Sequence, residues 1–448
     1  MFIRHSVLLI LACAVCTTQL SAEEKKTRDQ LVQEDRERVT ADGFWIYNDL
    51  PAAFAKAKET GKPLLVGFRC IPCEECVKLD DNLVNTDPVI RPLLEKFVCV
   101  RVVSTNGLDL SLFQYDTDQS FAMFMLNADR TIYGRFGTRS HRTEWYGDVS
   151  LPGLAKALEG ALELHANYDQ VKTSLAAKTG APLEFASPEK YPTLGERYTD
   201  RLDYSNNVAK TCIHCHQIGD ARRDYYRAQN KPIPERLLFP YPHPRSVGLI
   251  LDPNERATVK SVVPNSFAAE AGFRAGDRIQ SLNGQPLLSM ADVQWVLDQA
   301  DPAGATLTAS VLRGDAAAPQ QMSWTLPSGW RHKDDIDWRA SSWGLRRMVT
   351  GGMKLDALTA EERADLRIDD RQMALRVQHV GMYGKHAVAK NAGVKKGDVL
   401  VSYGSQDDLM TSGAVLAWGI QHTTPGEDLP ITLLRNGKPV KLKIRMQE

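Results

Sequence analysis

Apolar residues in the early part of the chain follow two different periods. Leu50, Phe54 and Ala57 recur at intervals of three to four residues, so we expect a helix over Asp49–Thr60. Leu64–Phe68 is instead a continuous apolar run, which is typical of a buried strand. The switch between the two periods indicates an α/β arrangement.

The apolar pattern continues to alternate in the same way along the next hundred residues. The sequence predicts a helix over Asp87–Lys96, strands over Phe97–Val103, Phe121–Leu126 and Thr131–Phe136, and a closing helix over Leu151–His165. Asn127–Arg130 lies between the last two strands and is a hairpin signal. We therefore expect one α/β domain over residues 41–165.

Two later segments resemble each other. Ala268–Ile279 and Ala387–Leu400 both contain Ala-Gly-Φ-x-x-Gly-Asp-x-Φ, where Φ is apolar, and they lie about 120 residues apart. One pair at this distance indicates a duplicated domain, because a solenoid would repeat at a shorter period. Residues 166–245 precede the pair and mix short helical stretches with Pro-rich loops.

Composition narrows the class of protein. The 448 residues are enough for two to four domains. Lys+Arg and Asp+Glu are both 55, so no basic excess exists to neutralise a nucleic acid backbone. Hydrophobic residues at 43% and charged residues at 25% are typical of globular proteins, which excludes a largely disordered chain.

The first 22 residues have the layout of an export signal. Arg4 and His5 form a basic start, Val7–Val15 is an apolar run, and small residues end at Ala22. We expect cleavage near Ala22 and a periplasmic or secreted protein. The alternative, a lipidated N-terminus at Cys13 or Cys16, stays open.

The chain after this signal starts with a charged stretch. Residues 23–40 are strongly charged, and we expect a loose leader there. The apolar run of the signal is too short to span a bilayer comfortably, so no integral membrane span is expected in the mature chain. Six cysteines remain after cleavage, in a compartment where disulfides form and haem is attached.

Three of these cysteines follow the first predicted strand. Cys70, Cys73 and Cys76 have the spacing CxxCxxC at the start of a predicted helix, where the helix dipole stabilises a thiolate. A strand, a CxxC motif and a helix in an exported chain resemble thioredoxin. The resemblance implies a redox-active pair, which we place at Cys73 and Cys76, with Cys70 as an extra ligand or a resolving thiol.

Other interpretations of this cluster remain open. No proline occurs in residues 116–121, where thioredoxins place a cis-proline opposite the active pair. Three thiolates at one helix start can also hold Cu or Zn, and a purely structural cluster is a third alternative. Cys99, within Val98-Cys99-Val100, is expected to be a buried core residue.

A second cysteine motif, CxxCH, lies in the connecting segment. Cys212 and Cys215 have the spacing for covalent attachment of haem c, and His216 is then the axial ligand of the haem iron. Residues around the motif are compatible with a helix, as at the start of a cytochrome c. The alternatives are a metal such as zinc, with His214 as a further ligand, and a plain disulfide.

The two repeats resemble PDZ domains of the HtrA type. The resemblance places the first over residues 246–330, with a carboxylate-binding loop at Gly248, Leu249, Ile250 and Leu251 and a groove helix over Met290–Leu297. The second covers 331–448. Its loop is expected at Trp343–Arg346, which includes Gly344 and Leu345, and its groove helix at Thr411–Ile420. Such domains add a peptide as a strand, so the partners implied are peptides or C-termini of exported proteins.

These features together predict a multidomain chain: an α/β thioredoxin-like domain, a mainly helical CxxCH segment and two PDZ-like β-sandwich or barrel domains. The resemblance to secreted thioredoxin–PDZ proteins suggests an exported redox protein that couples the cysteine cluster to a c-type haem. The alternative is a non-enzymatic periplasmic PDZ scaffold, or a protein whose cysteine clusters hold Cu or Zn. The sequence contains neither Gly-Asn-Ser-Gly-Gly nor Gly-Asp-Ser-Gly-Gly, so we expect no trypsin-like serine protease.

Overall fold

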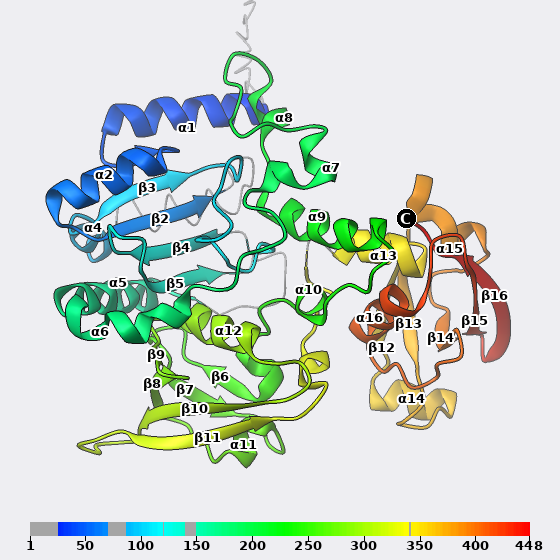
Figure 1. The fold of residues 1–448 in the computed structure, drawn as a ribbon. Helices are drawn as coiled ribbons and strands as arrows, with labels where there is room; N and C mark the ends of the chain where they lie inside the picture. The colour runs from blue at the N-terminus through cyan, green and yellow to red at the C-terminus, as the bar shows by residue number, and fades with distance from the viewer. Residues whose placement is uncertain (1–25, 70–86, 120, 139–148, 340–341) are drawn as a thin grey trace, which may run out of the picture.

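The structure, a computed structural model, describes residues 26–69, 87–119, 121–138, 149–339 and 342–448. Along the chain they form an α/β domain, a helical connection and two β-rich domains that resemble each other (Figure 1).

Some of the expected features fall on the remaining residues. The export signal and the cluster of Cys70, Cys73 and Cys76 lie outside the described residues.

The α/β domain contains one five-stranded sheet in the order β1-β3-β2-β4-β5. Its strands are β1 (Ile46–Tyr47), β2 (Leu64–Arg69), β3 (Val98–Val102), β4 (Phe121–Leu126) and β5 (Ile132–Thr138). Its helices are α1 (Arg28–Asp42), α2 (Leu50–Thr60), α4 (Ile90–Leu94), α5 (Leu151–Ala166) and α6 (Tyr168–Leu175). β2 pairs with β3 in parallel and with β4 in antiparallel orientation.

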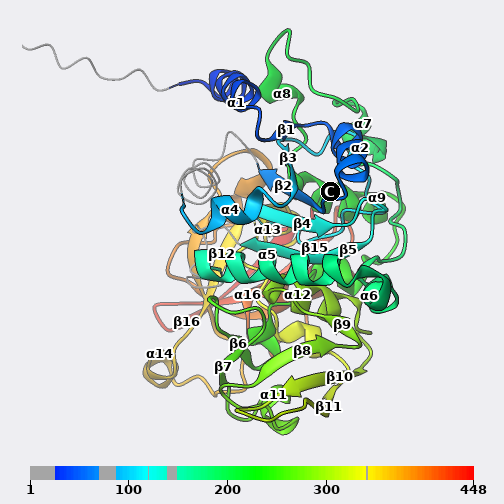
Figure 2. The ribbon, with the colours of Figure 1, turned by 90° about the vertical axis from the view of Figure 1, so that its left-hand side faces the viewer.

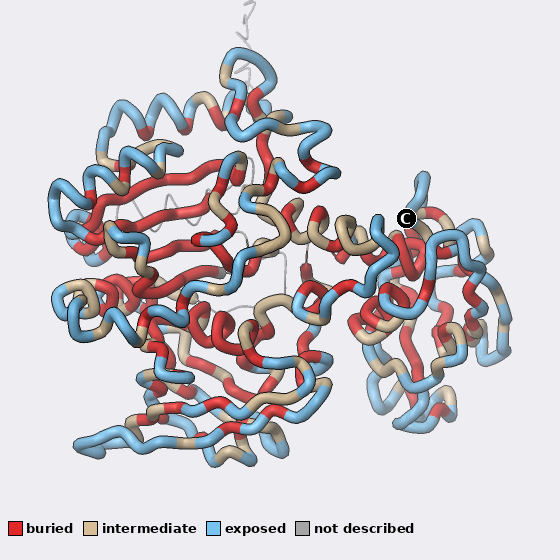
Figure 3. Tube along the Cα trace, in the orientation of Figure 1, coloured by how far each residue is buried: buried red, intermediate tan, exposed pale blue. Residues whose placement is uncertain are grey.

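The sheet is buried on both faces, which explains the continuous apolar runs. Leu64 and Val66 of β2 pack with α2 and α9, whereas Leu65 packs with α4 and α5 on the other face. Cys99 is 3% exposed and lies on the α4–α5 side, as expected of a core cysteine. Figures 2 and 3 show helices on both sides of these buried strands.

The charged leader expected over residues 23–40 is instead largely the helix α1. Thr27 and Gln30 form a capping box at its start. Val32, Asp35 and Val39 lie three to four residues apart and are buried against the domain. The expectation was wrong because most of the segment is charged, although one face of the helix is buried. On that face even the charged Asp35 is ion-paired, with Arg69 and Arg101.

The connecting segment contains four short or medium helices. They are α7 (Pro192–Gly195), α8 (Val208–Thr211), α9 (Cys215–Ala228) and α10 (Glu235–Leu238). Ile218 and Ala221 of α9 pack into the core cluster on the α2 face of the sheet. The segment is therefore part of the α/β domain's packing as well as a linker.

The first β-rich domain follows the 3-10 turn η3 (Pro244–Val247). Its elements are β6 (Leu249–Leu251), β7 (Val259–Val262), α11 (Phe267–Glu270), β8 (Arg278–Leu282), β9 (Gln285–Pro286), α12 (Met290–Gln299), β10 (Ala305–Leu312) and β11 (Gln320–Leu326). β6 pairs with β7, and the other strands form a sheet in the order β11-β10-β8-β9. The expected groove helix is α12, which continues two residues further than predicted.

The second β-rich domain has a similar order of elements, but it begins with a helix, has an extra helix between its first two strands and lacks a counterpart of β9. Its elements are α13 (Ser342–Thr350), β12 (Met353–Ala357), α14 (Ala360–Leu366), β13 (Leu375–Val380), α15 (Val388–Asn391), β14 (Val399–Tyr403), α16 (Ser412–His422), β15 (Asp428–Arg435) and β16 (Lys438–Arg445). The strands form one sheet in the order β12-β13-β14-β15-β16. The expected groove helix is α16, for which Thr411 is the N-cap.

Candidate functional sites

The two cysteines of the CxxCH motif face different parts of the protein. Cys212 follows α8 and is 4% exposed, in an apolar cluster with Val32 and Val103. Its Sγ lies 3.4 Å from the carbonyl oxygen of Val208. Burial, and after it the charge of Asp29, raises the pKa of Cys212 to about 11, so the thiol stays protonated at neutral pH.

Cys215 begins α9 and packs on the α2 face of the sheet. The hydroxyl of Tyr115 donates a hydrogen bond of 3.0 Å to its Sγ. Burial raises the pKa of Cys215, although this hydrogen bond acts in the opposite direction. Cys212 and Cys215 therefore belong to two separate apolar clusters.

The histidines of the motif are both partly buried. The side chain of His216 is 45% exposed, and its Nδ1 is 3.8 Å from Oδ2 of Asp220, one turn further along α9. Its ring stacks on that of His214, with centroids 5.9 Å apart and planes at 7°. Burial, and after it the neighbouring His216, lowers the pKa of His214.

This arrangement does not fit a haem held at both thiols. Such a haem needs Cys212 and Cys215 to reach one ring whose iron is bound by His216. Cys212 instead packs against α1, Cys215 against Tyr115, and His216 points to Asp220. The described residues also contain no group of three or more His, Cys, Asp or Glu side chains placed to hold a metal ion.

A cavity of about 250 Å³ lies beside α9, at the junction of the α/β domain, the connection and the first β-rich domain. Phe113, Tyr115 and Ile218 form part of its apolar wall. Two of its charged side chains, Arg222 and Glu184, form a bidentate pair at 2.8 and 2.9 Å. Arg236 and Asp298 form a second pair at 2.8 Å. Since these charges neutralise each other, the cavity does not select the sign of a ligand's charge.

The predicted loop of the first repeat is a sharp turn that starts a strand. Gly248 has a φ of 96°, and a Cβ there would lie 1.9 Å from Oγ of Ser266, so only glycine fits. Its carbonyl oxygen accepts a hydrogen bond of 2.9 Å from Val263, on the β7 side. Groups alternate along a strand, so Leu249 presents its N–H and C=O to the opposite edge. Among the described strands β6 pairs with β7 alone, so this edge has no strand partner.

The loop of the second repeat is not where the sequence suggested. Trp343–Arg346, with Gly344 and Leu345, lies inside α13 and is helical. The equivalent of Gly248 is Gly352, which has a φ of 88°. Its carbonyl oxygen accepts a hydrogen bond of 3.0 Å from the N–H of Gly381. The expectation was wrong because Trp-Gly-Leu resembles a loop in sequence, while the helix continues to Thr350.

A buried carboxylate clamps each repeat, a feature that the sequence analysis missed. Nε and Nη2 of Arg313 donate to the two oxygens of Asp277, both at 2.7 Å. Arg435 holds Asp398 in the same way, both at 2.8 Å. Each Asp belongs to the shared Gly-Asp motif, and each Arg follows two apolar residues at the end of a later strand. That second shared pattern was the available signal.

The groove helix α12 of the first repeat is locked onto the α/β domain. Nζ of Lys178 lies 2.8 Å from Oδ1 of Asp292, and both side chains are 1% exposed. The same carboxylate accepts from the backbone N–H groups of Arg135 and Leu288. The guanidinium of Arg135 lies 3.8 Å from the ring centroid of Trp295 on α12.

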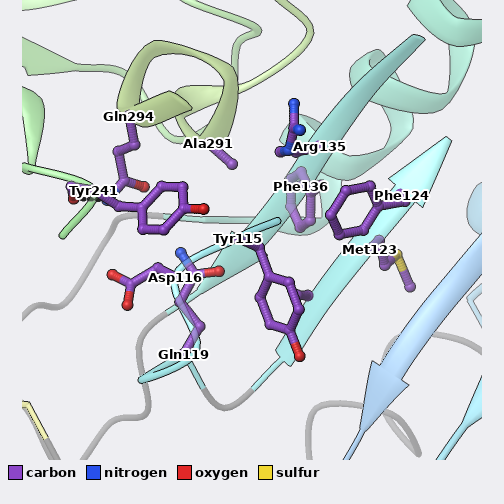
Figure 4. A pocket seen from close by; sticks show the side chains of 11 residues that line it. Tyr115, Asp116, Gln119, Met123, Phe124, Arg135, Phe136, Tyr241, Ala291 and Gln294 are labelled. Atoms are coloured by element: carbon purple, nitrogen blue, oxygen red, sulfur yellow. Dashed lines mark hydrogen bonds between the residues drawn. The ribbon is translucent and has the colours of Figure 1, made fainter. Parts of the chain in front are cut away.

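Figure 4 shows this interface from close by. Tyr241, Ala291 and Gln294 approach Tyr115 and Phe136 of the α/β domain, and the space between them is a cavity of about 10 Å³. The interface is therefore closely packed, and it fixes the orientation of α12.

Comparison with known families identifies two of the domains. A thioredoxin-like family model matches residues 45–128, and a PDZ domain model matches residues 258–309. The chain is thus a multidomain protein with a thioredoxin-like and a PDZ domain, as the sequence predicted. No described helix is long and apolar enough to cross a membrane.

The curated relatives are periplasmic proteases. The chain is 30% identical over 151 residues to the periplasmic pH-dependent serine endoprotease DegQ of Escherichia coli K12, which is 34% of this chain and 29% of the relative. It is 44% identical over 63 residues to the periplasmic serine endoprotease DegP of the same organism, 14% of this chain and 13% of the relative. The chain therefore spans less than a third of the length of these relatives.

Solved structures add little to this. The HtrA-type protease AlgW with a tripeptide is 17% identical, with 32% of this chain and 53% of that chain covered at a TM-score of 0.20. A serine endoprotease from Yersinia pestis is 19% identical, with 20% and 35% covered at a TM-score of 0.15. Likeness at this level supports no conclusion about function.

These relatives overturn the expected function. A redox protein that couples a cysteine cluster to haem c would match electron-transfer proteins, whereas the curated relatives DegQ and DegP are serine endoproteases. The expectations of redox activity, haem c and electron transfer were wrong, and the alternative of a non-enzymatic scaffold is not favoured either. A CxxC or CxxCH spacing is short, so it specifies a cofactor less strongly than a match along a whole domain does.

Proposed function

We propose that this protein recognises the C-terminal segments of exported polypeptides in the periplasm, as the substrate-binding step of a proteolytic system. Its export by residues 1–22 is part of the proposal. The carrying observation is the free edge of β6, the strand that follows Gly248 and packs with the groove helix α12.

The chemistry of this edge suits an extended peptide. Leu249 offers its backbone N–H and C=O to a strand that adds beside β6. Leu249, Leu251, Val293 and Leu297 belong to one buried apolar cluster that joins β6 and α12. Met290, on the face of α12 one turn before Gln294, is half-buried. A peptide with apolar final residues and a free carboxylate matches this lining.

A binding experiment on the full chain tests the proposal. The probe is a fluorescein-labelled decapeptide whose last three residues are apolar and whose carboxylate is free, with the amidated peptide as reference. We expect saturable binding by fluorescence anisotropy, and at least tenfold weaker binding after Met290→Asp or with the amide. Lys260→Asp, at an exposed position of β7, is the matched control and should bind like the wild type. Equal binding of acid and amide peptides would refute recognition of C-termini.

A second candidate is hydrolysis of the bound polypeptide by this chain itself. It is favoured by the names of the curated relatives, which are endoproteases. The assay is release of fluorescent fragments from labelled β-casein, with and without a serine-directed sulfonyl fluoride. Cleavage that the reagent abolishes would establish the protease. Binding without cleavage leaves recognition as the function and points to a separate protease.

A further inference from the structure

We propose that the peptide groove of the second PDZ repeat is occupied by the chain's own helix α13. The inference rests on the proposed function, because it treats the space between strand and helix as the peptide site.

The backbone fixes where the second groove lies. Gly352 and Gly248 have the same left-handed conformation and the same hydrogen bond to the next strand. β12 therefore corresponds to β6, and α16 corresponds to α12. Met353 then corresponds to Leu249 and presents its N–H and C=O to the edge that a peptide would use.

That edge already has a partner in the second repeat. The hydroxyl of Thr350, the last residue of α13, lies 2.9 Å from the carbonyl oxygen of Arg346 in its own helix and 3.1 Å from that of Met353. In the first repeat the hydroxyl at the same place, on Ser246, donates to His243 within its own turn, at 2.7 Å. Both hydroxyls therefore have an acceptor in their own turn, and that of Thr350 also lies within reach of the first acceptor of the strand edge.

The groove side of α16 is covered over its length. Ser412, Leu416 and Gly419 lie on one face, because they are spaced by four and three residues. At the start of this face, the hydroxyl of Ser412 donates a hydrogen bond of 2.9 Å to the carboxylate of Asp337. The same carboxylate accepts a hydrogen bond of 3.1 Å from Arg346 of α13.

Further along α16, the two helices come into direct contact. A Cβ built on Gly419 would lie 2.8 Å from Cβ of Val349, so a larger residue there would displace α13. Leu345, Val349, Leu355 and Leu416 belong to one buried cluster, which joins α13, β12 and α16. α13 thus fills the position of a bound peptide, with its apolar face inward and Trp343 48% exposed.

The first repeat is less covered at the start of its groove helix, although Gln294 and Leu297, the counterparts of Leu416 and Gly419, are also buried. The chain enters it through the Pro-rich turn η3 rather than a helix. The incoming Tyr241 contacts α12 at Gln294 and Asp298 through its backbone, at 3.1 and 3.0 Å. Met290, the counterpart of Ser412, remains half-buried, whereas Ser412 is 5% exposed.

Thiol labelling of the full chain tests the occupancy without any peptide. Two variants, Met290→Cys and Ser412→Cys, place a thiol at equivalent groove positions, and labelling with N-ethylmaleimide is followed at each by peptide mass spectrometry. We expect labelling at position 412 to be at least tenfold slower than at 290. Equal rates would overturn the inference, whatever the outcome of the peptide-binding assay.

Loosening α13 provides the second measurement. Leu345→Ser with Val349→Ser, added to Ser412→Cys, should speed labelling at position 412 at least tenfold, while Trp343→Ser should not change it. Circular dichroism identifies a variant that fails to fold. In that case the labelling rates of Met290→Cys and Ser412→Cys alone decide whether the inference holds. In titrations with the decapeptide, the wild type should bind one peptide per chain, and two equivalent sites would contradict a closed second groove.

Discussion

The buried pair of Lys178 and Asp292 offers the sharpest test of how the first PDZ repeat is held. Both side chains are 1% exposed, and their charged atoms are 2.8 Å apart across the interface with the α/β domain. At this distance, an effective dielectric constant of about 20 gives an attraction of roughly 6 kcal/mol, most of which is offset by desolvation of the two groups. The net value of the pair is therefore small, whereas the cost of breaking it is large.

The two partners should respond unequally to removal. Asp292→Ala leaves the Lys178 ammonium buried without this carboxylate. The backbone N–H groups of Arg135 and Leu288 also lose the acceptor to which they donate. We expect a loss of about 3–5 kcal/mol. Lys178→Met leaves a carboxylate that still accepts from those two N–H groups, so we expect a loss of about 1–3 kcal/mol.

Native-state hydrogen exchange of the α12 amides measures this difference, because it reports the free energy of local opening in the full chain. The control is Lys156→Met, which removes an exposed pair with Glu255 at the same interface, 2.9 Å long with side chains 44% and 37% exposed. It should change the opening free energy by less than about 1 kcal/mol. A smaller loss for Asp292→Ala than for Lys178→Met would refute the reasoning.

Three further predictions concern other parts of the chain. Gly352→Ala should destabilise the second repeat by more than the roughly 1–2 kcal/mol that a left-handed alanine costs, because its Cβ would lie 2.1 Å from a backbone oxygen. The control is Gly437→Ala, where the added Cβ would meet open space. Equal melting temperatures of the two variants would contradict this prediction. Burial alone would raise the pKa of Glu184, but hydrogen bonds from Arg222 outweigh it and lower the pKa to about 2, so the stability that this group adds above pH 4.5 is lost as the pH falls toward 2. The melting temperature of Glu184→Gln should therefore fall less between pH 4.5 and 2 than that of the wild type. An equal fall in both proteins would contradict this role of Glu184. Cys212, with its pKa raised to about 11, should react with iodoacetamide at pH 8 only after unfolding, and rapid labelling of the folded chain would disprove its burial.

The local patterns predicted most of the elements because periodicity reports which side of an element is buried. The run Leu64–Phe68 became β2, which is buried on both faces, and the Ala-Gly-Φ-x-x-Gly-Asp repeat marked both PDZ-like domains. The helix expected over Asp87–Lys96 shortened to α4, since Asp87 caps the turn before it through the N–H groups of Val89 and Ile90.

The candidate sites were predicted less well, because a site depends on what several segments bring together. Cys212 and Cys215 are three residues apart, yet one faces α1 and the other faces Tyr115. The loop of the second repeat was misplaced by eight residues, from Gly344 to Gly352, because the sequence does not show where α13 ends.

The sequence by itself determined the domain types, since a strand, a helix and a Gly-Asp turn are set by residues close together along the chain. It also determined which glycines can adopt a left-handed turn, Gly248 among them. Only the tertiary structure decided that α1 is ordered, that α12 is fixed by Lys178 and that α13 covers α16. Those outcomes depend on the burial of charged and apolar faces against segments that lie far away in sequence, and burial free energy is a property of the packed whole.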